Sequence, residues 1–288
     1  MKVSRKISAY IELTKPRILT LVLVTTSLGF YLGGGGISSY AVLAYLLLGA
    51  GLVCGGSGAL NHFVERDADS QMARTKNRPI PKGIISPADA LSYGIVLILS
   101  GVLILWWKVN LLTAFLSLLT AFLYVLVYTP MKKITWLNTS IGAIPGAIPP
   151  LGGWAAATGQ LPMEAWALFL ILFLWQHPHF YAIAWLCRED YKRGGFKMLP
   201  VVYPDGKSTF WQIKIFSLFL IPISLLPTLL GLSGKIYFYG ALLSGLVLLY
   251  IARSLASSKS TNDARKLLRA SVLYLPALLF LIVFDVTF

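Results

Sequence analysis

Long apolar stretches recur along the whole chain, and they constrain its fold more than any other feature. A helix needs about 20 apolar residues to cross the hydrocarbon core of a bilayer. Nine stretches approach that length, at about residues 17–35, 41–60, 91–107, 111–129, 138–157, 165–187, 212–232, 236–253 and 270–288. Only 12% of the 288 residues are charged, whereas soluble domains carry about 25%. The sequence therefore predicts an all-α polytopic membrane protein with nine transmembrane helices around a central cavity.

The basic residues are spread unevenly over the loops between these stretches. Of the 25 Lys and Arg residues, all but Lys108 and Lys235 fall on the side of the N-terminus. Because cytoplasmic loops carry the excess of Lys and Arg, this bias predicts a cytoplasmic N-terminus. An odd number of helices then puts the C-terminus outside. We expect a multi-pass protein of the cell membrane, surrounded by the lipid bilayer. The net charge of +14 reflects topology and anionic ligands, and no nucleic-acid partner is expected.

The loop after the second stretch carries oxygen ligands at helical spacing. Asn61, Glu65 and Asp69 recur every four residues, so they share one face if the second helix continues through them. Such donors suit a hard cation such as Mg²⁺. Basic residues that suit phosphate oxygens follow at Arg74, Lys76 and Arg78. The pattern predicts a metal-assisted diphosphate site; the alternative is a solvated face on which acids offset bases.

Ionisable residues also gather in and after the sixth stretch. His177 and His179 flank Pro178 within the apolar run, where polar side chains are costly and function is the default expectation. Pro178 can break the local hydrogen-bond ladder and open a pocket. Glu189 and Asp190 follow near the cytoplasmic end, again with basic residues just behind. The two long loops thus share one plan, acids at a helix end followed by cations.

Two further segments are notable. Tyr128 and Lys132 end the fourth stretch on the cytoplasmic face, where they either complete the anion site or serve as an aromatic-belt residue and a topology signal. Residues 142–153 are rich in Gly and Pro, which predicts a broken or tightly packed fifth helix.

These motifs resemble those of a known family. The run Asn61-x-x-x-Glu65-x-x-x-Asp69, followed by Arg-Thr-Lys-Asn-Arg-Pro, resembles the first aspartate-rich motif of the intramembrane prenyltransferase (UbiA) superfamily. Three segments are similar to its haem-modifying branch: Pro178-His179-Phe180, Glu189-Asp190-Tyr191 and Met198-Leu199-Pro200-Val201-Val202. The resemblance runs from about residue 10 to 285. Glu65 stands where the family more often has Asp, and Gly194 stands where a second paired Asp is expected.

The resemblance implies a fold and a reaction. It implies a single transmembrane prenyltransferase domain over residues 1–288, with loops 61–89 and 188–211 as a cytoplasmic active-site cap. It implies a Mg²⁺-dependent transferase that moves a farnesyl group from farnesyl diphosphate to a vinyl group of haem b. Water then completes a hydroxyethylfarnesyl substituent, giving haem o for terminal oxidases. A haem-modifying oxygenase or an oxidase assembly factor is the implied protein partner.

The resemblance also implies roles for individual residues. The catalytic acids and amide are Asn61, Glu65, Asp67, Asp69 and Asp190, and the metal ligands are Asn61, Glu65, Asp69, Glu189 and Asp190. The diphosphate ligands are Arg74, Lys76, Arg78, Tyr128, Lys132 and Lys197. His179 and His177 are the haem-binding residues, the alternative for His179 being a structural histidine bonded within the helices.

Two other functions fit parts of the pattern. A prenyltransferase acting on a quinone-precursor ring or a chlorophyll-type alcohol would use the same diphosphate site with another acceptor pocket. A secondary transporter would bind an anion at the ends of broken helices. The acids lie at the predicted cytoplasmic edge and not at the membrane midplane, which disfavours the transporter.

Overall fold

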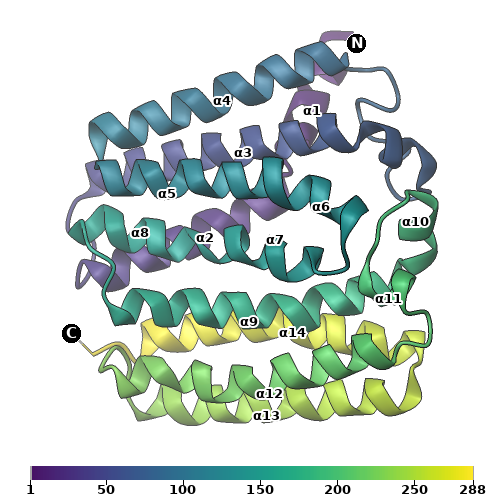
Figure 1. Ribbon diagram of the computed structural model, residues 1–288. Coiled ribbons are helices and arrows are strands. Elements are labelled where there is room, and N and C mark those ends of the chain that lie inside the picture. Colours follow the sequence, from purple (N-terminus) through teal and green to yellow (C-terminus); the bar gives the residue numbers. More distant parts are fainter. Residues whose placement is uncertain (1, 288) are drawn as a thin grey trace. The chain divides into compact units, whose positions relative to one another are not determined.

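The computed structural model describes residues 2–287, nearly all of them helical (Figure 1). The chain divides into two compact units. The first holds the residues up to Ile134 together with Ile148–Gln160 and Asp190–Phe196, and the second holds Thr135–Ala147, Leu161–Glu189 and the residues from Lys197 onward. The single domain over residues 1–288 stays a prediction.

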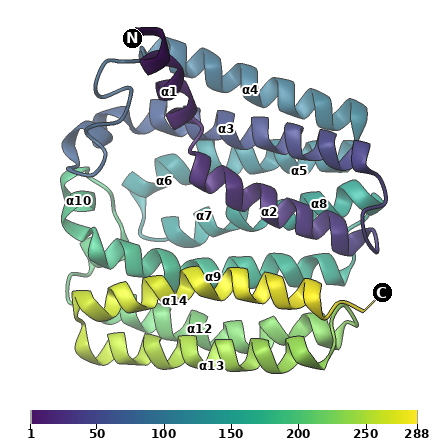
Figure 2. The same ribbon diagram turned by 180° about the vertical axis from the view of Figure 1, so that it is seen from behind.

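The first unit is built around one long helix. Its helices are α1 (Lys2–Leu13), α2 (Pro16–Gly33), α3 (Tyr40–Gln71), α4 (Pro87–Lys108), α5 (Leu111–Phe122), η1 (Leu123–Tyr128), α6 (Thr129–Ile134) and α8 (Pro149–Thr158). α3 packs against α2, α4 and α5, and α2 packs against α8 (Figure 2). Serine caps begin two of these helices: Ser39 Oγ accepts from Val42 N, and Ser86 Oγ accepts from Asp89 N.

Glycines allow these helices to approach closely. A Cβ at Gly56 in α3 would lie 2.6 Å from the carbonyl oxygen of Gly94 in α4. A Cβ at Gly153 in α8 would lie 1.9 Å from the carbonyl oxygen of Thr26 in α2. Small residues at helix contacts are typical of membrane proteins, because they let two backbones approach closely and improve the van der Waals packing that favours helix association in lipid. The Gly-rich segment 142–153 therefore has a packing role in α8.

The second unit is a ring of four long helices. α9 (Met163–Leu186), α12 (Lys207–Leu229), α13 (Lys235–Ser258) and α14 (Thr261–Phe284) each pack against two neighbours, and α7 (Asn138–Ala147) packs on α9. Figure 1 and Figure 2 show these four helices side by side. The short α11 (Leu199–Val202) contacts α9 and α12. α10 (Arg188–Arg193) lies where the chain passes from one unit to the other.

Eight of the described helical segments are long and apolar enough to cross a membrane. The remaining predicted span, residues 138–157, is divided at Ile148 into α7 and α8, each 10 residues long. Ten helical residues rise about 15 Å, half of a hydrocarbon core of about 30 Å. The fifth stretch, expected to be broken or tightly packed, is both: it is interrupted at Ile148 and Gly153 packs closely on α2. Nine crossings and the direction of the termini stay predictions.

α3 is longer than the sequence pattern suggested. Its 32 residues reach Gln71, about 48 Å at 1.5 Å per residue and more than a hydrocarbon core requires. The start of the expected loop 61–89 is therefore helical. The last turns of α3 hold Asn61, Glu65 and Asp69, which positions them on a rigid element.

Candidate functional site

Three oxygen-bearing side chains line one buried face of α3. Asn61 and Asp69 are 0% exposed and Glu65 is 5% exposed. Their four-residue spacing in a continuous helix puts them one above the other, as expected. Asp67 lies elsewhere on the helix, since its side chain is 77% exposed and pairs with Arg66 at 3.8 Å. The structure therefore separates Asp67 from the other three.

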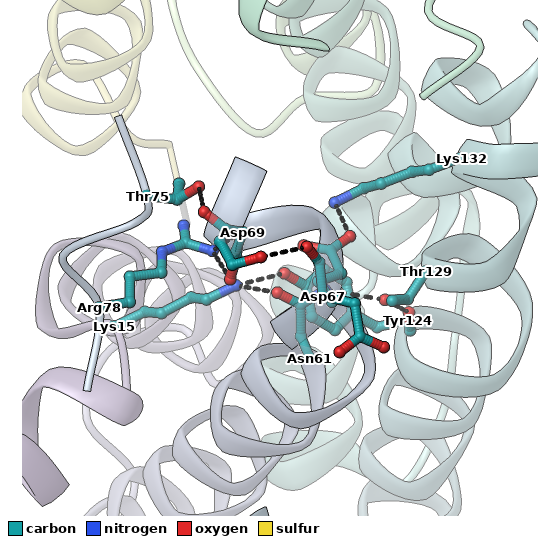
Figure 3. A network of polar contacts seen from close by, with 11 residues as sticks. Lys15, Asn61, Asp67, Asp69, Thr75, Arg78, Tyr124, Thr129 and Lys132 are labelled. Carbon is teal, nitrogen blue, oxygen red and sulfur yellow. Dashed lines mark hydrogen bonds and ion pairs between the residues drawn. The ribbon is translucent and has the colours of Figure 1, made fainter. Parts of the chain in front are cut away.

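A basic side chain contacts each of these three residues (Figure 3). Lys15 Nζ donates to Asn61 Oδ1. Lys132 Nζ donates to Glu65 Oε1 at 2.7 Å. Arg78 Nη1 donates to both carboxylate oxygens of Asp69, at 2.8 and 2.6 Å. Two carboxylates thus face three basic groups, and the excess of positive charge suits an anion. We name Lys15, Asn61, Glu65, Asp69, Arg78 and Lys132 the charged cluster.

Lys15 is a site residue that the sequence pattern did not single out. It precedes α2 with a left-handed backbone at φ 53°, which costs a non-glycine residue energy and is typical of functional sites. Its amine also donates to Tyr124 Oη at 3.2 Å. Burial lowers the pKa of Lys15 to about 7, against the attraction of Glu65, which raises it. A lysine at the positive end of a helix was the available signal, because the helix dipole disfavours it there.

A π-helical turn shapes the side of the cluster that holds Lys132. η1 spans Leu123–Tyr128, and Thr129 Oγ1 donates to the carbonyl of Tyr124 at 2.8 Å. Thr129 Oγ1 in turn accepts from Asn61 Nδ2 at 2.9 Å. The Lys132 ammonium lies 4.6 Å from the centre of the Tyr128 ring. Single π turns occur often at functional sites, and this one brings Tyr128 and Lys132 to the cluster.

The loop after α3 supplies one of the three predicted cations. Thr75 Oγ1 donates to the Asp69 carbonyl at 3.0 Å, which turns the chain back toward α3 and places Arg78 beside Asp69. Arg74 is exposed and lies over the Tyr191 ring at 5.7 Å. Lys76 is exposed as well. Arg78 thus belongs to the charged cluster, whereas Arg74 and Lys76 lie at the surface of the loop.

The second acidic segment is arranged differently from the first. Asp190 Oδ1 accepts from Ala73 N at 3.2 Å and from Arg193 Nη2 at 2.5 Å. Burial acts to raise the pKa of Asp190, but the hydrogen bonds from Arg193 and Ala73 together outweigh it and hold the pKa below its ordinary value. Glu189 is 76% exposed and lies 3.7 Å from Arg188. Lys197 is exposed, and its carbonyl accepts from Asn138 Nδ2 at 3.0 Å.

Gly194 has a packing reason. A Cβ there would lie 3.0 Å from Met72 Sδ, so this position accommodates the close approach of the two segments. Within residues 2–287, no three Asp, Glu, His or Cys side chains gather closely enough to hold a metal by themselves. Any metal at the first segment would therefore need the Asn61 amide oxygen or oxygen atoms of a substrate beside Glu65 and Asp69.

The two histidines of α9 lie in the second unit and differ from each other. α9 continues through Pro178 without interruption, although this proline has no N–H to donate to the hydrogen-bond ladder. His177 is 0% exposed and stacks on Phe216, with ring centres 3.6 Å apart. Its Nδ1 donates to the Phe173 carbonyl at 2.7 Å and its Nε2 lies 3.0 Å from Ser140 Oγ. Both nitrogens of His177 are thus engaged within the protein.

His179 is only partly buried, and its ring stacks on Trp175 with centres 5.0 Å apart. Nδ1 of His179 lies 2.9 Å from Ser271 Oγ of α14. No protein hydrogen bond to its Nε2 occurs among the contacts of the described residues, which leaves this atom as the candidate ligand of the pair.

Comparison with known proteins shows the family of this chain. The model of the UbiA prenyltransferase family matches residues 22–280. The chain belongs to the UbiA prenyltransferase family. A protoheme IX farnesyltransferase of Solibacter usitatus is 47% identical over 285 residues, covering 96% of this chain and 98% of that protein. One from Salinibacter ruber is 44% identical, with 96% and 98% covered.

Solved structures share the UbiA fold. A digeranylgeranylglyceryl phosphate synthase has a TM-score of 0.82 at 18% identity, covering 98% of both chains. A UbiA homologue from Archaeoglobus fulgidus, bound to DMAPP and Mg²⁺, has a TM-score of 0.74 at 17% identity, covering 95% of this chain and 99% of that one. The predicted all-α membrane fold is confirmed, and the chain is a multi-pass membrane protein of this family.

Proposed function

We propose that this UbiA family member converts haem b to haem o, by transferring the farnesyl group of farnesyl diphosphate to a vinyl group of haem. The observation that carries the chemistry is the charged cluster, in which an amide and two carboxylates on one face of α3 meet three basic side chains. The acceptor is inferred from the protoheme IX farnesyltransferases that match nearly the full chain.

Asn61, Glu65 and Asp69 fit the binding of Mg²⁺ together with a diphosphate. They are buried oxygen donors on one helix face, and each already accepts a contact from a positively charged group. When bound, Mg²⁺ would neutralise the charge of the diphosphate as it leaves. The homologue bound to DMAPP and Mg²⁺ supports this assignment, because DMAPP is also a prenyl diphosphate.

The three basic residues of the cluster would have different partners without and with bound substrate. Without substrate, Lys15, Arg78 and Lys132 hold the amide and the carboxylates, so neither buried carboxylate lacks a basic partner. With substrate, their N–H groups would turn to the phosphate oxygens, where charge develops as the leaving group departs. Of the other predicted ligands, Tyr128 would support Lys132, and the exposed Arg74, Lys76 and Lys197 would attract the anion from solution.

The reaction then follows from the ionised substrate. The bond between the farnesyl carbon and its oxygen breaks, and its electron pair leaves with the diphosphate. The allylic cation is attacked by the terminal carbon of a haem vinyl group, forming a carbon–carbon bond. Water adds to the resulting cation, a hydroxyl group forms, and one proton is released. Apolar helices around the reactants would limit stray water, which would otherwise hydrolyse the allylic cation.

We assign the haem iron to His179 and not to His177, because both nitrogens of His177 are engaged inside the protein. We further propose that Asp190 holds the loop after α3 in place through Ala73. Asp67 and Glu189, both highly exposed, would act only at the surface of the site. We place the protein in the cell membrane with its N-terminus in the cytoplasm, and infer a haem-modifying oxygenase or oxidase assembly factor as the partner that takes the product.

The test is an incubation of purified protein in detergent with haem b, farnesyl diphosphate and Mg²⁺, followed by mass spectrometry of the pigment. We expect a haem that carries a hydroxyethylfarnesyl group, and no such product when EDTA is present. Farnesylation of a quinone-precursor acid, offered in parallel, with no haem product would contradict the assigned acceptor. Binding of the diphosphate without any product would contradict the assigned reaction.

A further inference from the structure

Ser271 of α14 connects to two aromatic side chains of α9. Its carbonyl oxygen accepts from Trp175 Nε1 at 2.7 Å, and its hydroxyl oxygen lies 2.9 Å from His179 Nδ1. Trp175 and His179 are one helical turn apart, and their rings stack at 21° with centres 5.0 Å apart. Ser271 is 0% exposed. One buried residue thus fixes both the stacking partner and the orientation of the imidazole.

The hydrogen bonds around Ser271 determine where the proton of His179 lies. A serine hydroxyl has one hydrogen to donate and accepts through its oxygen. Ser271 Oγ lies 2.8 Å from the carbonyl of Leu268, and a carbonyl can only accept. The hydroxyl hydrogen is therefore committed to Leu268. Both contacts are hydrogen bonds only if His179 Nδ1 carries a hydrogen and donates it to Ser271 Oγ.

The opposite nitrogen of His179 then has a free lone pair. In a neutral imidazole, protonation at Nδ1 leaves Nε2 as the acceptor or metal ligand. A metal-bound histidine almost always donates its other N–H to a neighbouring acceptor, which fixes the ring and raises the basicity of the ligating nitrogen. Ser271 Oγ has this relation to His179.

We propose that Ser271 is a positioning residue, which holds His179 as the Nδ1-protonated tautomer so that Nε2 binds the iron of haem b. The inference rests on the proposed function, since it takes His179 as the iron ligand. It adds a residue on α14, about 90 positions away in sequence, whose hydroxyl determines which imidazole nitrogen meets the substrate.

His177 provides a matched comparison within the same helix. It also faces a serine hydroxyl, that of Ser140. Here, however, Nδ1 donates to the Phe173 carbonyl, and Nε2 accepts a hydrogen bond from the Ser140 hydroxyl. The hydroxyl therefore occupies the nitrogen that would bind a metal. Removing Ser140 deletes a hydroxyl–histidine contact of similar length, 3.0 Å against 2.9 Å, without touching His179.

The experiment titrates the full-length, detergent-purified protein with haem b alone, without farnesyl diphosphate or Mg²⁺. Visible absorption gives the affinity, and resonance Raman of the ferrous form gives the iron–histidine stretch. Four proteins are compared: wild type, His179→Ala, Ser271→Ala and Ser140→Ala. Circular dichroism and size-exclusion chromatography establish that each variant is folded before titration.

We expect the iron–histidine stretch to disappear in His179→Ala. In Ser271→Ala, the affinity should fall by about 10–100-fold and the stretch should move to lower frequency, as for other lost outer hydrogen bonds of metal-bound histidines. Ser140→Ala should match wild type in both measurements. A merely structural role of Ser271 would not move the stretching frequency of a histidine that stays bound.

Each contrary result has a definite meaning. An unchanged stretch in Ser271→Ala, with the stretch absent in His179→Ala, overturns the positioning role and leaves the ligand assignment intact. A normal stretch in His179→Ala overturns the ligand assignment and this inference with it, while haem o formation in the turnover assay would still support the proposed reaction. An equal shift in Ser140→Ala shows a general packing effect and also overturns the inference.

Discussion

The ion pair between Lys132 and Glu65 provides the sharpest test of the charged cluster. The two side chains are 14% and 7% exposed and their charged atoms lie 2.7 Å apart. Lys132→Met keeps most of the side-chain volume but removes the charge, which leaves the Glu65 carboxylate buried without its principal partner. Removing one member of a buried pair costs about 3–5 kcal/mol. We expect a loss of this size in the free energy of unfolding.

Catalysis should fall in the same variant for a separate reason. If the Lys132 ammonium also stabilises the leaving diphosphate, its removal should lower the turnover number by about 10²–10³-fold, as for one donor of an oxyanion site. The double variant Glu65→Gln/Lys132→Met should recover much of the lost stability, because no buried charge is left unpaired, but none of the lost activity.

The assay combines denaturant unfolding in detergent, followed by circular dichroism, with haem o formation by mass spectrometry. Lys133→Met is the matched control, since Lys133 is the exposed neighbour of Lys132 and should change neither quantity. A Lys132→Met protein that unfolds within about 1 kcal/mol of wild type, the range of exposed pairs, would refute the argument from burial. Activity recovered by the double variant would refute the catalytic role.

Three further variants test other parts of the structure. Lys15→Gly relieves the strain of the left-handed backbone at this position, which costs about 1–3 kcal/mol. The unfolding midpoint should therefore stay the same or rise, while the rate of farnesyl transfer falls. An unchanged rate would exclude Lys15 from the site. Asp69→Ala should abolish turnover yet remain folded in the membrane, because the 21% exposed Arg78 side chain can reach water; retained turnover would remove the proposed metal site. Gly153→Ala should lower the unfolding free energy by about 1–3 kcal/mol, because the added methyl group overpacks against α2. Gly152→Ala is the control, since the space around its Cβ is open. Equal losses in the two variants would contradict this packing argument.

Periodicity and charge predicted the parts of this protein that depend on local sequence. The four-residue spacing of Asn61, Glu65 and Asp69 puts the three side chains on one face only if these residues lie in a helix. They do, because α3 continues past residue 60. The Gly- and Pro-rich fifth stretch predicts a broken or tightly packed helix, and Ile148 separates its two halves. Local pattern was sufficient in both cases.

Contacts between distant segments could not be predicted in the same way. Lys15 lies 46 residues before Asn61, and its place just before a helix does not indicate which distant residue it contacts. Ser271 lies 92 residues beyond His179 in an apolar helix where serine is unremarkable. For Asp67 the sequence predicted a site residue that the structure does not place there. It stands among the site acids in the sequence, but its position on the helix turns its side chain to the surface.

The π-helical turn at Leu123–Tyr128 makes the charged cluster sensitive to the length of this helix as well as to its composition. Each α-helical residue turns the chain by about 100°, whereas the wider π turn takes up one extra residue for nearly the same total rotation. Deletion of one residue between this turn and Lys132 would not be absorbed in this way and would rotate Lys132 by about 100°. Lys132 would then leave Glu65, although every residue of the cluster would still be present. A gap in an alignment at this point would therefore mark a change in the proposed substrate site, where a count of matching residues would detect none.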